Sequence, residues 1–197
     1  DLTQIDFTGC NALAKVEINN NRITDFEISA VPMLKYLNCS HNFMIDLDVR
    51  NSTTLATLYC QNCRLDNLYV GGCKNLETLM CGYNHLTSLN LLGVENLQYL
   101  NVDDNKFTTM IVQGLPALYA FSCMNNRLTS LAMRDCGNLL DLYCSNNDLT
   151  KLVVMDCPKL TYVDCSYNDL TDLDLSNQYL LERLICNNNS LMTLNVS

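Results

Sequence analysis

Residues 139–159 read LLDLYCSNNDLTKLVVMDCPK, and this stretch decides the fold. Its first residue is position 1 of a 21-residue unit that recurs along the chain without insertion or deletion. Leucine occupies position 1 in every copy: Leu13, Leu34, Leu55, Leu76, Leu97, Leu118, Leu139, Leu160 and Leu181. Such regularity is typical of a solenoid, in which each coil buries its apolar side against the neighbouring coils.

The repeats cover the chain, so we predict one solenoid domain over residues 1–197. They comprise a half repeat at 1–12, complete repeats at 13–33, 34–54, 55–75, 76–96, 97–117, 118–138, 139–159 and 160–180, and a partial repeat at 181–197. Because both ends stop within the pattern, we expect a segment of a longer array. Uncapped ends expose strand edges, so end-to-end contacts through the termini are a further expectation.

Two short strands are predicted in each coil. Positions 4 to 6 alternate apolar, polar and apolar, as in Leu142, Tyr143 and Cys144, which indicates a strand with one buried face. Positions 11, 14 and 16 are apolar in the back half, which favours a second short strand. The predicted fold class is all-β with minimal 3-10 content: nine parallel coils with a curved concave sheet in front and a second, short-strand sheet on the back.

Residues at position 18 mark the corner that follows the back strand. Most are of types that tolerate a left-handed backbone: Gly9, Asn51, Gly72, Gly93, Gly114, Asp135, Asp156 and Asn177, with Ala30 as the exception.

Asparagine occupies position 9 in eight of nine repeats. The column consists of Asn21, Asn42, Asn84, Asn105, Asn126, Asn147, Asn168 and Asn189, and Cys63 is the departure. A carboxamide both donates and accepts, so we expect this column to bond the unpaired backbone groups of the turn from coil to coil.

The twelve cysteines follow the repeat, not a disulfide or metal pattern. Seven lie at position 6 (Cys39, Cys60, Cys81, Cys123, Cys144, Cys165 and Cys186) and four at position 19 (Cys10, Cys73, Cys136 and Cys157). Other repeats carry isoleucine, valine or leucine at these positions, so we expect free, buried thiols that act as small hydrophobic groups. The pair Cys60 and Cys63 forms a C-x-x-C, which we also interpret as core.

Composition narrows the function classes. The chain is 48% hydrophobic and 17% charged, with a net charge of −9. We therefore expect a folded domain that binds no nucleic acid, since phosphate backbones are bound through excess Lys and Arg. No apolar run approaches the 18 or more residues that a bilayer span needs, so we expect no insertion into membranes.

No set of residues indicates catalysis, a cofactor or a metal. The two histidines, His41 and His85, are read as surface residues. Acidic residues crowd two repeats and could hold calcium, but they fall at positions that face different ways: Asp141, Asp148, Asp164, Asp169, Asp172 and Asp174. We expect a solvated acidic edge, no cofactor and no enzyme activity.

Tyrosine gathers at positions 3, 5 and 8, which should point outward from the front sheet. We predict a partner-binding surface formed by Tyr36, Tyr59, Met80, Tyr83, Tyr99, Tyr143, Tyr162 and Tyr167. A phenol offers a rigid apolar ring with one polar tip, which suits binding surfaces. Tyrosine also favours strands, and rings on neighbouring coils can simply stabilise a sheet. Both interpretations stay open.

The pattern L-x-x-L-x-C-x-x-N-x-L-T-x-L-x-V-x-x-C-x-x resembles the leucine-rich repeat family, most closely its 21-residue, internalin-like bacterial surface type. The resemblance implies a curved solenoid that binds a protein or glycan on its concave face, at the cell surface or outside the cell. A cytoplasmic location is the alternative. The alternative function is a structural spacer or adhesin segment without a specific binding face.

Overall fold

The computed structural model describes residues 1–50 and 52–196, which form two compact units, Asp1–Leu97 and Gln98–Ser197. Apart from one 3-10 helix, the regular structure of the described residues consists of short β-strands. Each unit is a parallel β-solenoid, so the predicted fold class is confirmed. That the chain is one domain and a segment of a longer array stays a prediction.

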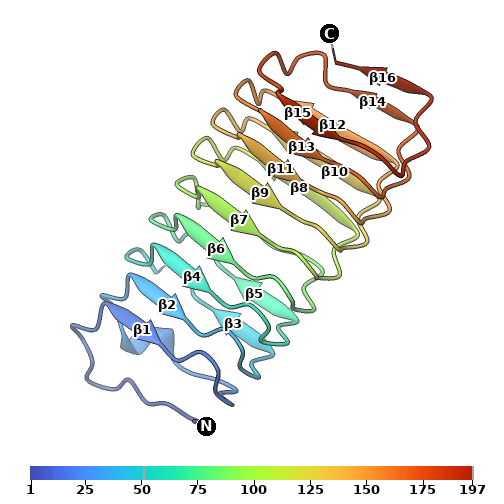
Figure 1. Ribbon diagram of the computed structural model, residues 1–197. Coiled ribbons are helices and arrows are strands. Elements are labelled where there is room, and N and C mark those ends of the chain that lie inside the picture. Colours follow the sequence, from blue (N-terminus) through green and yellow to red (C-terminus); the bar gives the residue numbers. More distant parts are fainter. Residues whose placement is uncertain (51, 197) are drawn as a thin grey trace. The chain divides into compact units, whose positions relative to one another are not determined.

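The first unit has four front strands and two back strands among the described residues (Figure 1). The front strands are β1 (Lys15–Glu17), β2 (Tyr36–Asn38), β4 (Thr57–Tyr59) and β6 (Thr78–Met80), paired in that order. The back strands are β3 (Asp46–Asp48) and β5 (Asn67–Tyr69), and the 3-10 helix η1 spans Ile28–Ala30. Val16 pairs with Leu37 and Leu37 with Leu58, so every coil advances by one 21-residue repeat.

The second unit has five front strands and five back strands among the described residues. The front strands are β7 (Tyr99–Asn101), β9 (Ala120–Ser122), β11 (Asp141–Tyr143), β13 (Tyr162–Asp164) and β15 (Arg183–Ile185). The back strands are β8 (Thr109–Gln113), β10 (Ser130–Arg134), β12 (Lys151–Met155), β14 (Asp172–Asp174) and β16 (Thr193–Asn195). In Figure 1 the front strands of this unit lie side by side.

The core of each unit is built from the predicted apolar columns. Leu58 and Leu79, at position 4 of neighbouring coils, are both fully buried. The residues on either side of Leu58 are only partly buried, as expected for a strand that packs one face inward. Removing such leucines from water is the main driving force for stacking one coil on the next.

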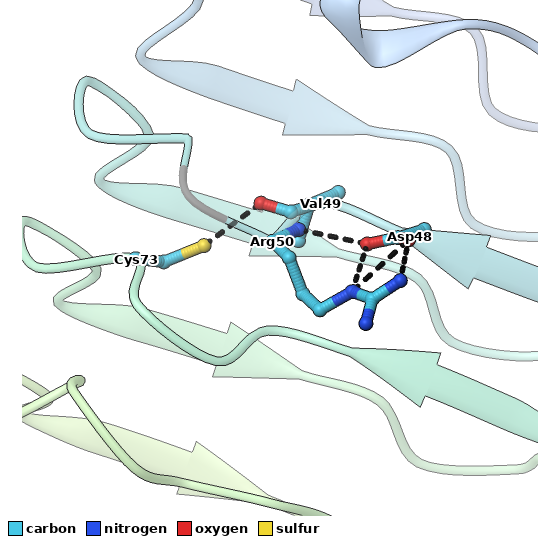
Figure 2. Close-up of polar contacts among 4 residues, drawn as sticks. All are labelled: Asp48, Val49, Arg50 and Cys73. Atoms are coloured by element: carbon cyan, nitrogen blue, oxygen red, sulfur yellow. Dashed lines mark hydrogen bonds and ion pairs between the residues drawn. The ribbon is translucent and has the colours of Figure 1, made fainter.

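The residue at position 15 accounts for the difference in length between the back strand β3 and the longer back strands of the second unit. The five-residue strands β8, β10 and β12 carry Ile111, Ala132 and Val153 there. The three-residue strand β3 has Asp48 instead, whose Oδ1 accepts a hydrogen bond of 3.0 Å from the Arg50 amide (Figure 2). This side-chain turn takes the amide away from the ladder and ends the strand.

The corner at position 18 is left-handed in most coils. Positive φ angles occur at Gly9, Gly72, Gly93, Gly114, Asp135 and Asp156. Asn177 does not have a positive φ. Ala30 closes its corner through η1, because alanine seldom adopts a positive φ. Asn51 lies outside the described residues.

Candidate functional site: the front surface and its turn edge

The asparagine column at position 9 fixes the turn that follows each front strand. The Asn147 Nδ2 atom lies 3.0 Å from the Cys123 carbonyl oxygen of the preceding coil, and 3.2 and 3.3 Å from the carbonyl oxygens of Cys144 and Ser145. Its Oδ1 atom accepts a 3.0 Å bond from the Leu128 amide. Asn42, Asn84 and Asn168 repeat the pattern, so the predicted ladder is confirmed.

The thiols are free and most are buried, as predicted. Cys10 is exposed and Cys186 half-buried, because each lies in a coil that has a described neighbour on one side only. The thiols also donate: Cys73 Sγ lies 2.9 Å from the Val49 carbonyl oxygen in Figure 2. Burial raises the pKa of Cys165 to about 12 and holds the pKa of Cys60 well above its ordinary value, so these thiols stay protonated.

The seven tyrosines and Met80 that were predicted to bind a partner lie on the outward side of the front strands and their turns, here called the front surface. Tyr36, Tyr59, Met80, Tyr143 and Tyr162 are half-buried against neighbouring side chains, and Tyr83, Tyr99 and Tyr167 are exposed.

Two aromatic rings pack against each other at a tilt in each unit. In the first unit, the Tyr36 and Tyr59 ring centroids lie 5.8 Å apart, and Lys15 Nζ lies 4.9 Å from the Tyr36 centroid. In the second unit, Tyr143 and Tyr162 lie 5.0 Å apart and Arg183 lies over Tyr162 at 5.4 Å. Tyr99 pairs separately with Tyr119 at 6.3 Å. Each of these two groups, Lys15–Tyr36–Tyr59 and Tyr143–Tyr162–Arg183, thus joins two tilted rings and one cation on adjacent coils.

Position 8, directly before the asparagine column, is left-handed in every coil that has a front strand. The φ angles at Asn20, His41, Asn62, Tyr83, Asp104, Asn125, Asn146, Tyr167 and Asn188 lie between 51° and 57°. Asparagine and aspartate tolerate this conformation, which explains their frequency here. The enrichment is visible in the sequence, but left-handed residues were predicted only at the other corner, position 18.

Positions 5, 7 and 8 of the first unit enclose a groove of about 530 Å³, here called the turn groove. It is lined by Asn19, Asn20, Asn38, Ser40, His41, Tyr59, Gln61, Asn62 and Tyr83. Two of these, Tyr59 and Tyr83, belong to the predicted partner-binding residues. The other seven were not predicted, although the 21-residue register brings their positions to one edge of the front sheet.

The same edge is more acidic in the second unit. Asp103, at position 7, is 8% exposed and accepts hydrogen bonds from the Ser122 hydroxyl at 2.6 Å, the Met124 backbone amide at 2.7 Å and Asn101 Nδ2 at 2.6 Å. Burial raises the pKa of Asp103 despite these bonds, which lower it. The carboxylate therefore fastens two neighbouring turns together.

The acidic residues of the last coils act on their own neighbours. Hydrogen bonds from the Thr193 and Thr171 hydroxyls lower the pKa of Asp172, and the Ser176 hydroxyl does the same for Asp174. Among residues 1–50 and 52–196, no group of three or more His, Cys, Asp or Glu side chains could hold a metal ion. Within the same residues, no helix has the length and apolar character that crossing a bilayer requires.

Comparisons with known proteins identify the kind of repeat. A leucine-rich repeat family model matches residues 96–118. Across 98% of its length the chain is similar to the functional domain of InlJ from Listeria monocytogenes, which includes a cysteine ladder, with 26% identity and a TM-score of 0.57. The chain covers 53% of that protein, about half its length. No curated protein matches the chain.

Two further solved structures share the fold. The leucine-rich repeat domain of APL1B gives a TM-score of 0.80 at 21% identity, covering 98% of this chain and 65% of that one. The leucine-rich repeat protein LIC12759 of Leptospira interrogans gives 0.51 at 20% identity, covering 93% and 74%. Domains of this type are typically non-catalytic binding modules. With its 21-residue coil, its matching repeat and this shared fold, the chain belongs to the leucine-rich repeat proteins.

Proposed function

We propose that the chain is a non-catalytic interaction module that binds a protein or glycan partner through the tyrosine-rich front surface. The observation that carries the proposal is the two aromatic pairs, each with a cation over one ring: Tyr36–Tyr59 with Lys15 and Tyr143–Tyr162 with Arg183. Rings packed against one another in this way have little freedom before a partner arrives, so binding them orders few side chains and loses little conformational entropy.

Exposure of single rings adds support. Tyr83 in the first unit is 63% exposed, and Tyr167 and Tyr99 in the second are 55% and 44% exposed, which leaves large apolar area beside polar groups in each unit. Aromatic residues flanked by polar groups are typical of the centres of binding interfaces. The family resemblance to bacterial surface proteins leads us to propose a location at the cell surface or outside the cell.

The competing function is a structural spacer or adhesin segment, for which the ring pairs would only stabilise the sheet. Replacing Tyr59, Tyr143 and Tyr162 together by Ser separates the two. Binding is measured by surface plasmon resonance against an arrayed panel of extracellular proteins and oligosaccharides. The recognition proposal predicts that every specific wild-type interaction weakens by at least about tenfold, the equivalent of one to two ring contacts.

A matched control uses tyrosines that lie away from the front surface. Tyr69 is on the back strand β5 and Tyr179 lies in a corner, and both are exposed, so replacing them by Ser should leave binding unchanged. Circular dichroism and thermal melting establish that both variants fold. Retained binding in the folded triple variant would contradict recognition by the front surface, and no binding by the wild type would favour the spacer.

A further inference from the structure

We propose that the turn groove of the first unit is a binding site for neutral oligosaccharides, whose rings stack on Tyr59 and Tyr83 and whose hydroxyls bond to the surrounding amides. This inference rests on the proposed function of the front surface and names the class of ligand for one part of it. The groove reaches from Asn19 in the first coil with a front strand to Tyr83 in the fourth, roughly 14 Å at the usual spacing of strands.

The volume and lining of the groove suit a small polar ligand. Its volume of about 530 Å³ falls within the usual size of small-molecule sites, roughly 300–1,000 Å³. Five of its nine lining residues carry carboxamides, each of which presents a donor and an acceptor side by side. Neighbouring sugar hydroxyls also donate and accept, so a carboxamide can bond to two of them at once.

Hydrogen bonds within the groove orient these groups before a ligand binds. The Ser40 hydroxyl donates to Gln61 Oε1 at 2.8 Å, which leaves the two N–H groups on Gln61 Nε2 as the part of that side chain suited to a ligand oxygen. The Gln61 amide donates to the same hydroxyl at 3.2 Å, and Ser40 is buried. A carboxamide held in this way loses little further freedom on binding.

The second pair across the groove is His41 and Asn62, on adjacent coils. Asn62 Nδ2 lies 3.0 Å from His41 Nδ1. Because an amide nitrogen only donates, Nδ1 accepts, and the neutral imidazole carries its proton on Nε2. This arrangement leaves His41 Nε2–H as a donor and Asn62 Oδ1 as an acceptor for a ligand.

The backbone at Tyr83 indicates that its ring is there for contact with a ligand. Tyr83 has a φ of 57°, in a column where most coils carry asparagine or aspartate. A bulky residue is unfavourable in this conformation, and the exposed ring gains no core packing in return. Together with the half-buried Tyr59 it supplies two apolar faces in an otherwise polar groove.

The charge of the groove selects a neutral ligand. Among the described residues, none that lines it is Asp, Glu, Lys or Arg. Sialylated or sulfated sugars would find no cation to pair with and would approach a chain of net charge −9. Cationic ligands would find no carboxylate to pair with. Uncharged hexose and N-acetylhexosamine oligosaccharides need neither a cation nor a carboxylate in the groove.

The test uses the whole chain and a defined set of probes: maltotriose, cellotriose, chitotriose and N-acetyllactosamine, with sialylated and sulfated N-acetyllactosamine as charged counterparts. Binding is followed by nitrogen-15 NMR titration, which reports both affinity and place. At least one neutral probe should shift the side-chain amide signals of Gln61 and Asn62. The sialylated and sulfated N-acetyllactosamine should bind at least about tenfold more weakly than that neutral probe, because like charges repel.

Two variants test the site without disturbing its backbone. Tyr83→Asn removes a ring but installs the residue that this left-handed position favours, and Asn62→Gly removes an amide while keeping the positive φ. Each variant should lower the affinity for the neutral probe by roughly tenfold, the effect of losing one ring contact or one good hydrogen bond. Tyr179→Asn and Asn146→Gly make the same two side-chain changes in the second unit, outside the groove, and should leave affinity unchanged.

The outcomes separate this inference from the proposed function. If no neutral probe binds while a protein partner is lost in the Tyr59, Tyr143 and Tyr162 triple variant, the groove inference is overturned and the front surface stands. If a neutral probe binds equally well to Tyr83→Asn and Asn62→Gly, the groove is the wrong place and the inference fails. If the wild type binds neither a neutral probe nor a protein partner, the groove inference and the proposed function are both overturned.

Discussion

Positions 8 and 9 are neighbours in every coil, yet they follow opposite rules. The position 9 amides, such as Asn147, point inward and bond to two coils, whereas the position 8 residues, such as Asn146, face solvent with a left-handed backbone. Both columns are rich in asparagine, for different physical reasons. At position 9 the side chain supplies hydrogen bonds, and at position 8 asparagine is tolerated because of its backbone.

This difference teaches how a repeat protein separates stability from recognition. A change at position 9 leaves backbone groups unpaired inside the turn, so the column is nearly invariant within the chain. Position 8 places no such demand on its side chain, and His41, Tyr83 and Tyr167 can replace asparagine there. We therefore expect the inner columns to determine stability and the outer positions to determine what is bound.

The largest effect is expected from the inner column. Asn147→Ala removes the donors to three carbonyl oxygens and the acceptor for the Leu128 amide. The free energy of unfolding should fall by about 3 kcal/mol, since several buried backbone groups lose their partner. The same change at the less buried Asn126 should lower it by about 1–3 kcal/mol. Urea unfolding followed by circular dichroism measures both values.

The matched control is Asn146→Gly, one residue earlier. Glycine keeps the left-handed backbone, so stability should change by less than about 0.5 kcal/mol. Equal losses for Asn146→Gly and Asn147→Ala would mean that the two columns do not differ as described.

A smaller effect of opposite sign is expected at Cys63, where the ladder is interrupted. Its Sγ lies 3.1 Å from the Cys39 carbonyl oxygen and takes the place of the Nδ2 donor of an asparagine. A thiol has no counterpart of the Oδ1 atom that would accept a hydrogen bond from the Met44 amide. The next residue, Arg64, is the only described residue at position 10 with a positive φ, of 66°. Cys63→Asn should restore the ladder and stabilise the chain by about 1 kcal/mol.

Thermal melting under reducing conditions measures that gain, and Cys60→Ala serves as a comparison because it removes a buried thiol without adding an amide. A lower melting temperature for Cys63→Asn would show that this turn cannot adopt the conformation of its neighbours.

The smallest effect concerns pH and compares a buried with an exposed carboxyl. Burial raises the pKa of Asp103, whereas the Arg50 guanidinium lowers the pKa of Asp48. Stabilisation from Asp103 is therefore full below its unfolded pKa and lost as the pH rises through the folded pKa. Stabilisation from Asp48 is present above its unfolded pKa and is lost as the pH falls through its folded pKa. Carbon-13 NMR titration should give Asp103 the higher midpoint, and the reverse order would contradict this account.

Much of the fold follows from the 21-residue register alone. The residue pattern over positions 1 to 16 predicts the apolar columns, both strands and the buried asparagine ladder, because each coil must present the same face to its neighbours. The length of the back strands was not predicted, although Asp48 against Val153 at position 15 carries the signal. A short side chain that bonds its own backbone competes with the ladder, and hydrophobic periodicity does not register that competition.

The candidate site could be predicted only in part. Tyrosine columns indicate a surface, but the pairing of Tyr36 with Tyr59 joins position 3 of one coil to position 5 of the next, which depends on side-chain rotamers. The turn groove depends on polar residues at position 7, where Ser40 and Gln61 stand in one unit and Asp103 in the other. No periodic signal marks such a site, because its chemistry lies in the differences between repeats.

Side-chain hydrogen exchange tests the central claim most directly, namely that neighbouring asparagine columns face opposite environments. The Nδ2–H exchange rates of Asn147 and Asn168 can be compared by NMR with those of Asn146 and Asn125 in the same sample. The account predicts exchange at least about a hundredfold slower at position 9, because those amides are buried and bonded to carbonyl oxygens. Similar rates in the two columns would contradict it.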